Sequence, residues 1–219
     1  MNKLLLGISI LIILSACDEN KQIVGKNDAV NYIAQKEMTE STQQINNAPV
    51  TTDIDTEIIQ ARSVIRTFAG TLKGELQAGI KAGGPVTALE VCNTNAPQIA
   101  TKVATESGIQ VSRVSLKNRN PDNAPNVWQK AILEDFEIRN AAGADPTTLE
   151  FSEVVEHDGN KEFRFMKAIP TGGVCLACHG ENLASDVQET ITTLYPDDKA
   201  TNFKLGDLRG SFVVTKTLH

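Results

Sequence analysis

The apolar positions of the chain change their period along its length. From Thr56 onward, apolar side chains recur at steps of three and four residues, the spacing that buries one face of an α-helix. The positions that follow this period are Ala61, Ile65, Phe68, Leu72, Leu76 and Ile80. Gly83-Gly84 is predicted to end this helix, because glycine readily takes the left-handed conformation found at helix C-termini, and Pro85 can open the next helix.

Two further helices are predicted before the first strand. Residues 86–93 read as a short helix that carries Cys92. Asn95 has the character of an N-cap and Pro97 that of an early-turn proline. A separate helix is therefore expected to begin there and to run to about Ser107.

The second half of the chain alternates between strand and helix signals. Segments with strand character cover residues 109–116, 149–155, 161–169 and 206–218. His157-Asp158-Gly159-Asn160 separates the two central segments and is a good hairpin signal. Trp128, Ile132 and Phe136 mark the buried side of one helix, and residues 185–194 form another. Helices first and paired strands afterwards indicate an α+β domain around an antiparallel sheet.

The N-terminal residues have the pattern of a secretory signal. Met1-Asn2-Lys3 is a short basic start, and the apolar run over residues 4–14 is too short to span a bilayer comfortably. Leu14-Ser15-Ala16-Cys17 resembles the bacterial lipobox, in which cleavage precedes a cysteine that is then acylated on sulfur. Residues 1–16 are interpreted as a lipoprotein signal peptide and Cys17 as the lipid attachment site, with an ordinary signal peptide as the alternative.

The predicted lipid places the mature protein outside the cytoplasm, on the periplasmic side and tethered to a membrane, because several acyl chains together give stable attachment. Asp18 and Glu19 resemble the signal that keeps lipoproteins at the inner membrane. Residues 17–54 are polar and are predicted to link the lipid to one domain over residues 55–219. The net charge is −6, and removing Lys3 with the signal peptide makes it −7. No basic block is present, so nucleic acid is not an expected partner.

One motif near the end of the chain carries specific chemistry. Cys175-Leu176-Ala177-Cys178-His179 has the Cys-x-x-Cys-His form that attaches c-type haem. Each thiol can add to one haem vinyl group, and the adjoining histidine can present an imidazole nitrogen to the iron. Two other interpretations of the cysteine pair fit less well. A thioredoxin-like redox pair is expected near the start of a βαβ unit, whereas this motif lies late in the chain, after Pro170. A zinc site needs a further Cys/His pair, which the sequence does not supply. One covalent haem c per chain is predicted, held by Cys175, Cys178 and His179.

The side of the iron opposite His179 is either open or filled by a second residue. With lipid on Cys17 and haem on Cys175 and Cys178, Cys92 has no partner for an intramolecular disulfide. It is then either a buried structural residue, since free cysteine behaves as a small hydrophobe, or an iron ligand. Further candidates, each with an ordinary place in the core, a turn or a chain end, are Met166, His157 and His219.

A series of short motifs follows in a specific order over the domain. They are Gly83-Gly84-Pro85, Leu89-Glu90-Val91-Cys92, Ala96-Pro97-Gln98-Ile99-Ala100, Val111-Ser112-Arg113, Arg119-Asn120-Pro121-Asp122-Asn123, Arg164-Phe165-Met166, Cys175-Leu176-Ala177-Cys178-His179-Gly180, Tyr195-Pro196 and Gly206-Asp207-Leu208-Arg209-Gly210. This series resembles a family of c-type haem domains, formerly of unknown function, with His/Cys axial ligation. The resemblance runs from about residue 56 to the C-terminus. It implies a PAS-like antiparallel sheet flanked by helices and preceded by a long N-terminal helix.

The resemblance also implies roles for individual residues. It makes His179 the proximal ligand, Cys92 the thiolate opposite it, and Cys175 and Cys178 the attachment points. A thiolate favours ferric iron and lowers the reduction potential, and it can weaken or leave on reduction. Separately, haem propionates favour arginine or hydroxyl donors. The candidates for that task are Arg113, Arg119, Tyr195 and Arg209.

Two functions suit these predictions. One is a redox or gas-responsive module, whose signal passes to an unidentified redox or signalling protein because the chain carries no kinase or cyclase region. The other is an electron carrier tethered to the membrane, which keeps the same ligands in both oxidation states. An enzyme such as a peroxidase needs a general acid/base near an open iron face, and no helix offers a distal His with an Arg beside it. The chain is therefore not expected to be an enzyme.

Overall fold

A computed structural model describes residues 53–157 and 159–218 of the 219-residue chain. The predicted signal peptide over residues 1–16, the lipid site at Cys17 and the linker up to residue 52 lie outside the described residues, as does His219. Within the described ranges, no helix combines the length and the apolar character needed to cross a bilayer.

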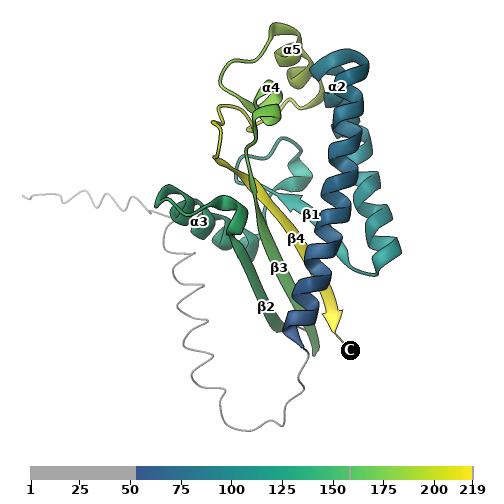
Figure 1. Ribbon diagram of the computed structural model, residues 1–219, viewed down its shortest axis with the longest axis vertical. Helices are drawn as coiled ribbons and strands as arrows, with labels where there is room; N and C mark the ends of the chain where they lie inside the picture. Colours follow the sequence, from purple (N-terminus) through teal and green to yellow (C-terminus); the bar gives the residue numbers. More distant parts are fainter. Residues whose placement is uncertain (1–52, 158, 219) are drawn as a thin grey trace, which may run out of the picture.

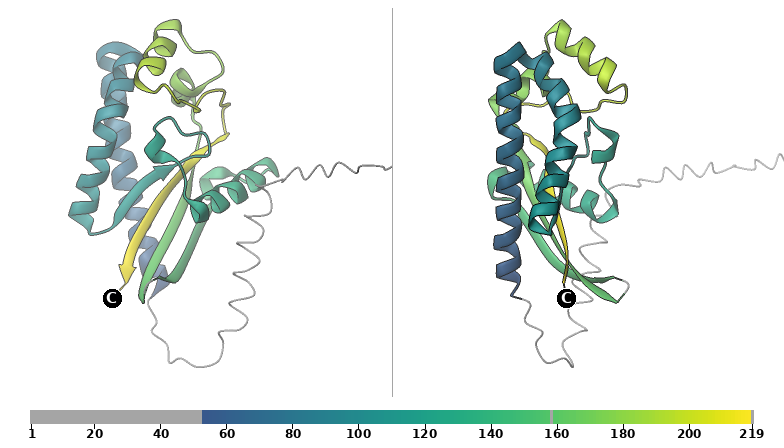
Figure 2. Two further views of the ribbon diagram at one scale, coloured as in Figure 1. Left: turned by 180° about the vertical axis from the view of Figure 1, so that it is seen from behind. Right: turned by 90° about the vertical axis from the view of Figure 1, so that its right-hand side faces the viewer.

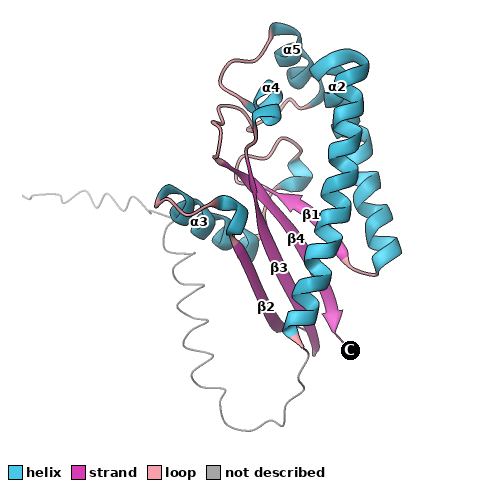
Figure 3. Ribbon diagram, viewed as in Figure 1, coloured by secondary structure: helices cyan, strands magenta, loops and turns pink. Residues whose placement is uncertain are grey.

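Four strands of the described chain form one antiparallel sheet in the order β1-β4-β3-β2 (Figure 3). Their bounds are β1 Gln110–Val114, β2 Glu150–His157, β3 Asn160–Pro170 and β4 Leu208–Leu218. β2 and β3 form the predicted hairpin, with His157 opposite Asn160 and Gly159 at a φ of 75°. β4 then returns from the end of the chain to lie between β1 and β3.

A long helical hairpin precedes the sheet. Helix α2 spans Ile54–Ser107, and non-helical backbone angles at Gly83 and Gly84 divide it into two arms. Gly84 has a φ of 78°, which glycine adopts without strain. The arms pack closely, since a Cβ on Gly79 would lie 3.1 Å from the Cα of Ala88. Figure 2 shows the two arms side by side, and the predicted break at the glycine pair is confirmed.

The second arm of α2 is continuous, so the separate helix predicted from Asn95 and Pro97 is wrong. Backbone angles inside α2 depart from helical values only at the glycine pair. Pro97 removes one backbone hydrogen bond. However, the Asn95 amide donates to Glu75 of the first arm at 3.2 Å, and Ala96 and Ile99 are buried in the core beside the sheet. This packing outweighs the local signal for a helix start.

Both faces of the sheet are covered, by α2 on one side and by α3 (Val127–Ala141) on the other. Side chains of β3 alternate between the two cores: Phe163 and Phe165 face α2, whereas Met166 and Ala168 face α3. This is the period of two that a strand imposes. Met166 is fully buried in the core on the α3 side. This candidate iron ligand is therefore a core residue.

The remaining helices lie at the end of the sheet where the two arms of α2 meet (Figure 1). They are α4 Leu176–His179 and α5 Ser185–Leu194. A small apolar cluster of Leu89 from α2 with Val187 and Ile191 from α5 joins them, and Cys178 packs against it. Short 3-10 turns occur at Pro121–Asn123, Pro146–Thr148 and Gly173–Cys175. The predicted α+β class, a long N-terminal helix before an antiparallel sheet with helices, is confirmed, and the arrangement is consistent with a PAS-like fold.

Candidate haem site

The Cys-x-x-Cys-His motif forms a compact turn directly after β3. The 3-10 turn Gly173–Cys175 runs into α4, so Cys175 and Cys178 stand one helical turn apart. The chain before the motif is fixed by Thr171, whose N–H donates to the Asp207 carbonyl at 2.8 Å and whose carbonyl accepts from Gly206 at 2.9 Å. The two sulfurs therefore sit on a short segment held to the start of β4.

Gly180 ends α4 at a position where no side chain fits. Its N–H donates to the Leu176 carbonyl at 3.0 Å, and a Cβ on Gly180 would lie 2.6 Å from that same oxygen. Its own carbonyl accepts from the backbone N–H of Asn202 at 3.1 Å. The glycine after the histidine thus lets the loop over residues 200–203 lie directly against the motif.

That loop fixes the imidazole of His179. The Nδ1 atom of His179 lies 2.7 Å from the Ala200 carbonyl oxygen, which can only accept a hydrogen bond. Nδ1 therefore carries the proton, and Nε2 keeps its lone pair for a metal. Phe203 meets the imidazole edge-on with ring centroids 6.3 Å apart, and its N–H donates to the His179 carbonyl at 3.0 Å.

Electrostatics keep His179 in the form that can bind a metal. Burial, assisted by the positive charges of Arg209, Arg119 and Arg113, holds the pKa of His179 well below its ordinary value of 6.5. The bond to Ala200 opposes this effect but does not reverse it. The imidazole is consequently neutral at physiological pH, as ligation requires.

Cys92 on the second arm of α2 is half-buried and faces the same three arginines. Burial raises the pKa of its thiol, whereas Arg113, Arg119 and Arg209 lower it in part. Because these guanidinium groups act on both Cys92 and His179, the structure brings the two predicted ligands to one cluster of positive charge. Among the described residues the cysteines are free thiols: Cys92, Cys175 and Cys178.

The three arginines of this cluster differ in their partners. Arg119 is buried and pairs with Asp198. Arg209 donates to the Ser115 hydroxyl and the Lys117 carbonyl, both at 3.2 Å, and so has neutral acceptors. Burial, together with Arg119 and Arg113, lowers the pKa of Arg209 to about 10.

Arg113 is the least satisfied of the predicted propionate partners. Its guanidinium lies 5.7 Å from the centroid of the Phe68 ring, and within the described chain it has neither a hydrogen bond nor an ion pair. Burial lowers its pKa from the ordinary value. A half-buried guanidinium of this kind is a site for an anion.

Tyr195 borders the same cluster. Burial and the neighbouring Cys92 raise the pKa of its phenol to about 12, so the hydroxyl stays protonated and can donate. The Arg119 guanidinium lies 5.9 Å from the centroid of its ring. The four candidates for propionate binding are thus brought together near Cys92 and His179, although Arg119 is already paired.

Two of the rival iron ligands, Met166 and His157, lie away from this site, and the third, His219, is outside the described residues. Met166 lies in the core on the α3 side. His157 ends β2 in the hairpin that opens β3, whereas the haem motif follows the other end of β3. An 11-residue strand at about 3.3 Å per residue separates these ends by roughly 35 Å.

Sequence reasoning missed Asp198, Ala200 and Phe203, which surround His179. Ala200 acts through its backbone carbonyl, a group that every residue carries, so no sequence pattern could identify it. Asp198 follows Tyr195-Pro196 closely, but Asp197 lies between them, so the sequence does not show which of the two carboxylates pairs with Arg119. In the described part of the chain, no three His, Cys, Asp or Glu side chains gather as ligands for a bare metal ion.

The donor set fits the predicted haem. Two free thiols one turn apart match the two vinyl groups, and a neutral imidazole with its Nδ1 proton engaged matches the metal. Unneutralised arginines beside them match carboxylate groups. The fit rests on chemistry that converges from α2, β1, α4 and β4.

A family model described as Tll0287-like matches residues 12–216 of the chain. Among solved structures, the chain is similar to the protein in "Crystal structure of the cyanobacterial heme-protein Tll0287", with a TM-score of 0.52 and 24% sequence identity. The match covers 76% of this chain and 96% of the cyanobacterial chain, and it shows a shared fold. No curated protein matches the chain.

Proposed function

Because the chain belongs to the Tll0287-like family, we propose that it is a c-type haem protein that acts outside the cytoplasm as a redox or gas-responsive module. The carrying observation is that two thiols, a neutral tethered imidazole and a third thiol share one arginine cluster. A solved protein of the same fold is described as a heme-protein, which supports the proposal. The module is proposed to be non-enzymatic.

In this proposal, Cys175 and Cys178 hold one haem through two thioether bonds. His179 would offer Nε2 to the iron while its Nδ1–H donates to the Ala200 carbonyl, and Cys92 would offer its sulfur as a second ligand. A bound haem supplies a one-electron couple and an axial position that can exchange its ligand. Because burial favours the neutral thiol of Cys92, the Cys92 thiolate depends on the iron and the arginines for its stability, and reduction weakens that support.

The charges of the site support two propionates. A ferric porphyrin carries one net positive charge, which the Cys92 thiolate cancels. Two propionates then leave two negative charges, and Arg113 and Arg209 supply two positive charges that no carboxylate within the described residues neutralises by a direct ion pair. Arg113 and Arg209 are therefore the proposed propionate partners, with the Tyr195 hydroxyl as an additional donor.

The proposal also covers location. A lipid on Cys17 ties the module to the periplasmic side of the inner membrane, and the polar residues 17–54 separate it from the bilayer. Redox partners or signalling proteins then meet the module at this surface. Growth with a radiolabelled fatty acid should label the wild-type chain and leave a Cys17→Ala variant unlabelled.

Substitution of Cys92 tests the ligand set. In Cys92→Ala, denatured protein should keep its haem because Cys175 and Cys178 are intact, while the ferric optical and EPR spectra lose their thiolate features. His157→Ala is the matched control for a rival ligand and should leave the spectra unchanged. An unchanged spectrum in Cys92→Ala removes Cys92 as the ligand.

Carbon monoxide separates a responsive module from an electron carrier. Reduced wild-type protein should bind CO readily, because the Cys92 sulfur would bind ferrous iron only weakly and CO could replace it. A reduced spectrum that is blind to CO supports the tethered electron carrier instead. Purified protein with no iron-porphyrin spectrum contradicts haem binding, and haem that acidified organic solvent extracts contradicts covalent attachment.

A further inference from the structure

We propose that Arg119 and Asp198 are positioning residues that fix the hydrogen bond of His179 and thereby set the reduction potential of the iron. This inference rests on the proposed haem binding. It assigns Arg119 a task different from that of Arg113 and Arg209, with which it was grouped by sequence. Three features of the structure carry it: the geometry of the ion pair, the carbonyls it holds and the position of those carbonyls relative to His179.

Arg119 and Asp198 form a buried, two-point ion pair. Nε of Arg119 lies 3.1 Å from Oδ1 of Asp198, and Nη2 lies 3.1 Å from Oδ2. Both side chains are 8% exposed. This parallel arrangement fixes the plane of the guanidinium, which a single contact does not.

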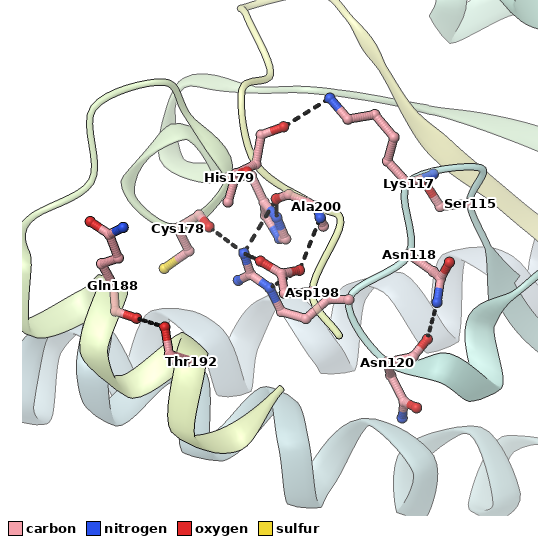
Figure 4. A network of polar contacts seen from close by, with 12 residues as sticks. Ser115, Lys117, Asn118, Asn120, Cys178, His179, Gln188, Thr192, Asp198 and Ala200 are labelled. Carbon is pink, nitrogen blue, oxygen red and sulfur yellow. Dashed lines mark hydrogen bonds and ion pairs between the residues drawn. The ribbon is translucent and has the colours of Figure 1, made fainter. Parts of the chain in front are cut away.

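The fixed guanidinium contacts the backbone on both sides of His179. Nη2 of Arg119 donates to the carbonyl of Cys178 at 2.6 Å, the peptide group that leads into His179. The same nitrogen lies 3.3 Å from the carbonyl of Ala200, which accepts the Nδ1 proton of His179. Figure 4 shows the labelled residues Cys178, His179, Asp198 and Ala200 converging through these contacts.

Asp198 contacts Ala200 as well, through the backbone N–H of that residue. Its Oδ1 accepts the backbone N–H of Ala200 at 2.9 Å, so the ion pair contacts Ala200 at both its N–H and its carbonyl. Lys199 adds a backbone bond to the Asn118 carbonyl at 3.1 Å, next to Arg119 in sequence. The acceptor of the His179 proton is thus held by a buried ion pair in addition to its loop.

The hydrogen bond at Nδ1 governs how strongly an imidazole donates to a metal. A firm acceptor gives the ring more anionic character, which favours ferric iron and lowers the potential. Loss of the fixed guanidinium lets the Ala200 carbonyl drift from Nδ1, so the potential should rise. Arg119→Lys is the decisive variant, because it keeps the positive charge while removing the planar fork.

We expect Arg119→Lys to retain covalent haem and to shift the ferrous-to-ferric ratio at a fixed potential at least tenfold toward ferrous, which equals about 59 mV for one electron. The ferric EPR signal should change with it, since the plane of the axial imidazole affects that signal. Arg139→Lys, in an exposed pair with Asp135, is the control and should change neither readout. A shift below threefold with an unchanged EPR signal overturns the inference.

A second variant covers failure of Arg119→Lys to fold. Asp198→Glu keeps both charges but moves the carboxylate by one methylene, and the same rise in potential is expected, with no rise counting against the inference. Haem attachment is measured separately on denatured protein. Wild-type protein without covalent haem defeats the proposed function, whereas haem-loaded variants with wild-type potentials defeat only the role of the ion pair.

Discussion

The sheet with its two covering helices and the haem-motif end of the molecule are stabilised in different ways. The sheet buries apolar side chains on both faces, including the fully buried Phe68, Phe136, Phe163 and Phe165. The motif end has a small apolar cluster and is otherwise joined by polar contacts to backbone carbonyls. Apolar burial stabilises the first region without a ligand, whereas the second collects charges that suit one.

The balance of charge makes this difference concrete. Three arginines act on Cys92 and His179, and only Arg119 among them has a carboxylate partner in the described chain. Unneutralised guanidinium groups are costly to bury. We therefore expect the sheet to fold without haem, and the motif end to gain stability when the anionic groups of the proposed haem are bound.

The largest expected effect is the complete loss of haem from a protein whose sheet stays folded. Replacing both Cys175 and Cys178 by alanine should abolish covalent haem completely, because no vinyl group can then form a thioether bond. Haem staining of denatured protein measures this loss, and circular dichroism should still report a folded α+β domain. Cys92→Ala is the control and should keep its stain. Haem that stays bound through denaturation in the double variant contradicts the assignment.

A substitution in the core beside the sheet should instead destabilise the fold and leave the haem attached. Phe165→Ala removes a fully buried ring from the core between β3 and α2. It should lower the free energy of unfolding by about 3–5 kcal/mol, with or without haem, and leave covalent attachment intact. Urea denaturation measures the change. Val127→Ala, at an 80% exposed position, should stay within about 0.5 kcal/mol of wild type.

The effect of Arg113→Gln on the free energy of unfolding should depend on whether haem is bound. With haem bound, Arg113→Gln should cost about 1.5–3 kcal/mol, the worth of a hydrogen bond to a charged group. In the Cys175→Ala/Cys178→Ala background, the same change should be neutral or stabilising, because it removes an unpaired guanidinium. Thermal or urea unfolding of the four proteins gives the comparison. Arg66→Gln, an exposed arginine on α2, should be neutral in both.

Equal costs of Arg113→Gln in both backgrounds would show that the guanidinium stabilises the protein chain itself. That result would remove Arg113 as a propionate partner and leave Arg209 as the remaining arginine for the task. It would also weaken the contrast between the two regions, because the motif end would then be complete without a ligand.

The same contrast explains which features the sequence predicted. Phe163, Phe165 and Val214 are buried side chains that follow the two-residue period of a strand, and the buried side chains from Ala61 to Leu72 follow the period of a helix. Because these elements bury one face against the core, their apolar pattern is visible in the sequence. The attachment motif is local, and its three residues do lie on one short turn. By contrast, the prediction of a helix start at Asn95-Pro97 is wrong. Contacts between the two arms of α2, such as the bond from Asn95 to Glu75, keep the helix continuous there, and a local sequence pattern does not show such contacts.

The polar contacts around His179 depend on residues far apart in the chain. Arg113, Arg119 and Arg209 are equivalent candidates in the sequence, whereas the structure separates Arg119 from the other two by its ion pair with Asp198. The Ala200 carbonyl has no side chain to read. Polar contacts between distant backbone and side-chain groups follow from the fold, so a sequence can supply the participants without showing their pairing.

The smallest expected effect concerns an ion pair on the sheet side. Glu150 joins the first arm of α2 to β3, accepting from Nε of Arg62 at 3.0 Å and from Nζ of Lys167 at 2.7 Å. Burial raises the pKa of Glu150, but the hydrogen bonds from Arg62 and Lys167 outweigh burial and hold the pKa below its ordinary value of 4.5. A carboxyl with a depressed folded pKa contributes stability above about pH 4.5 and loses it as the pH falls through the folded pKa.

Glu150→Gln should therefore cost about 1 kcal/mol or less near neutral pH, because the Arg62 side chain is 47% exposed and solvent screens the pair. The cost should vanish below the folded pKa of Glu150, so urea-unfolding curves of variant and wild type should converge as the pH is lowered. Glu181→Gln is the matched control at the motif end, where the pair with Lys204 is exposed and 3.7 Å long, and it should change nothing. Curves that stay apart at low pH would mean that Glu150 acts through packing and not through charge. The sheet side would then be stabilised by shape alone, and the contrast with the charged motif end would be sharper than proposed.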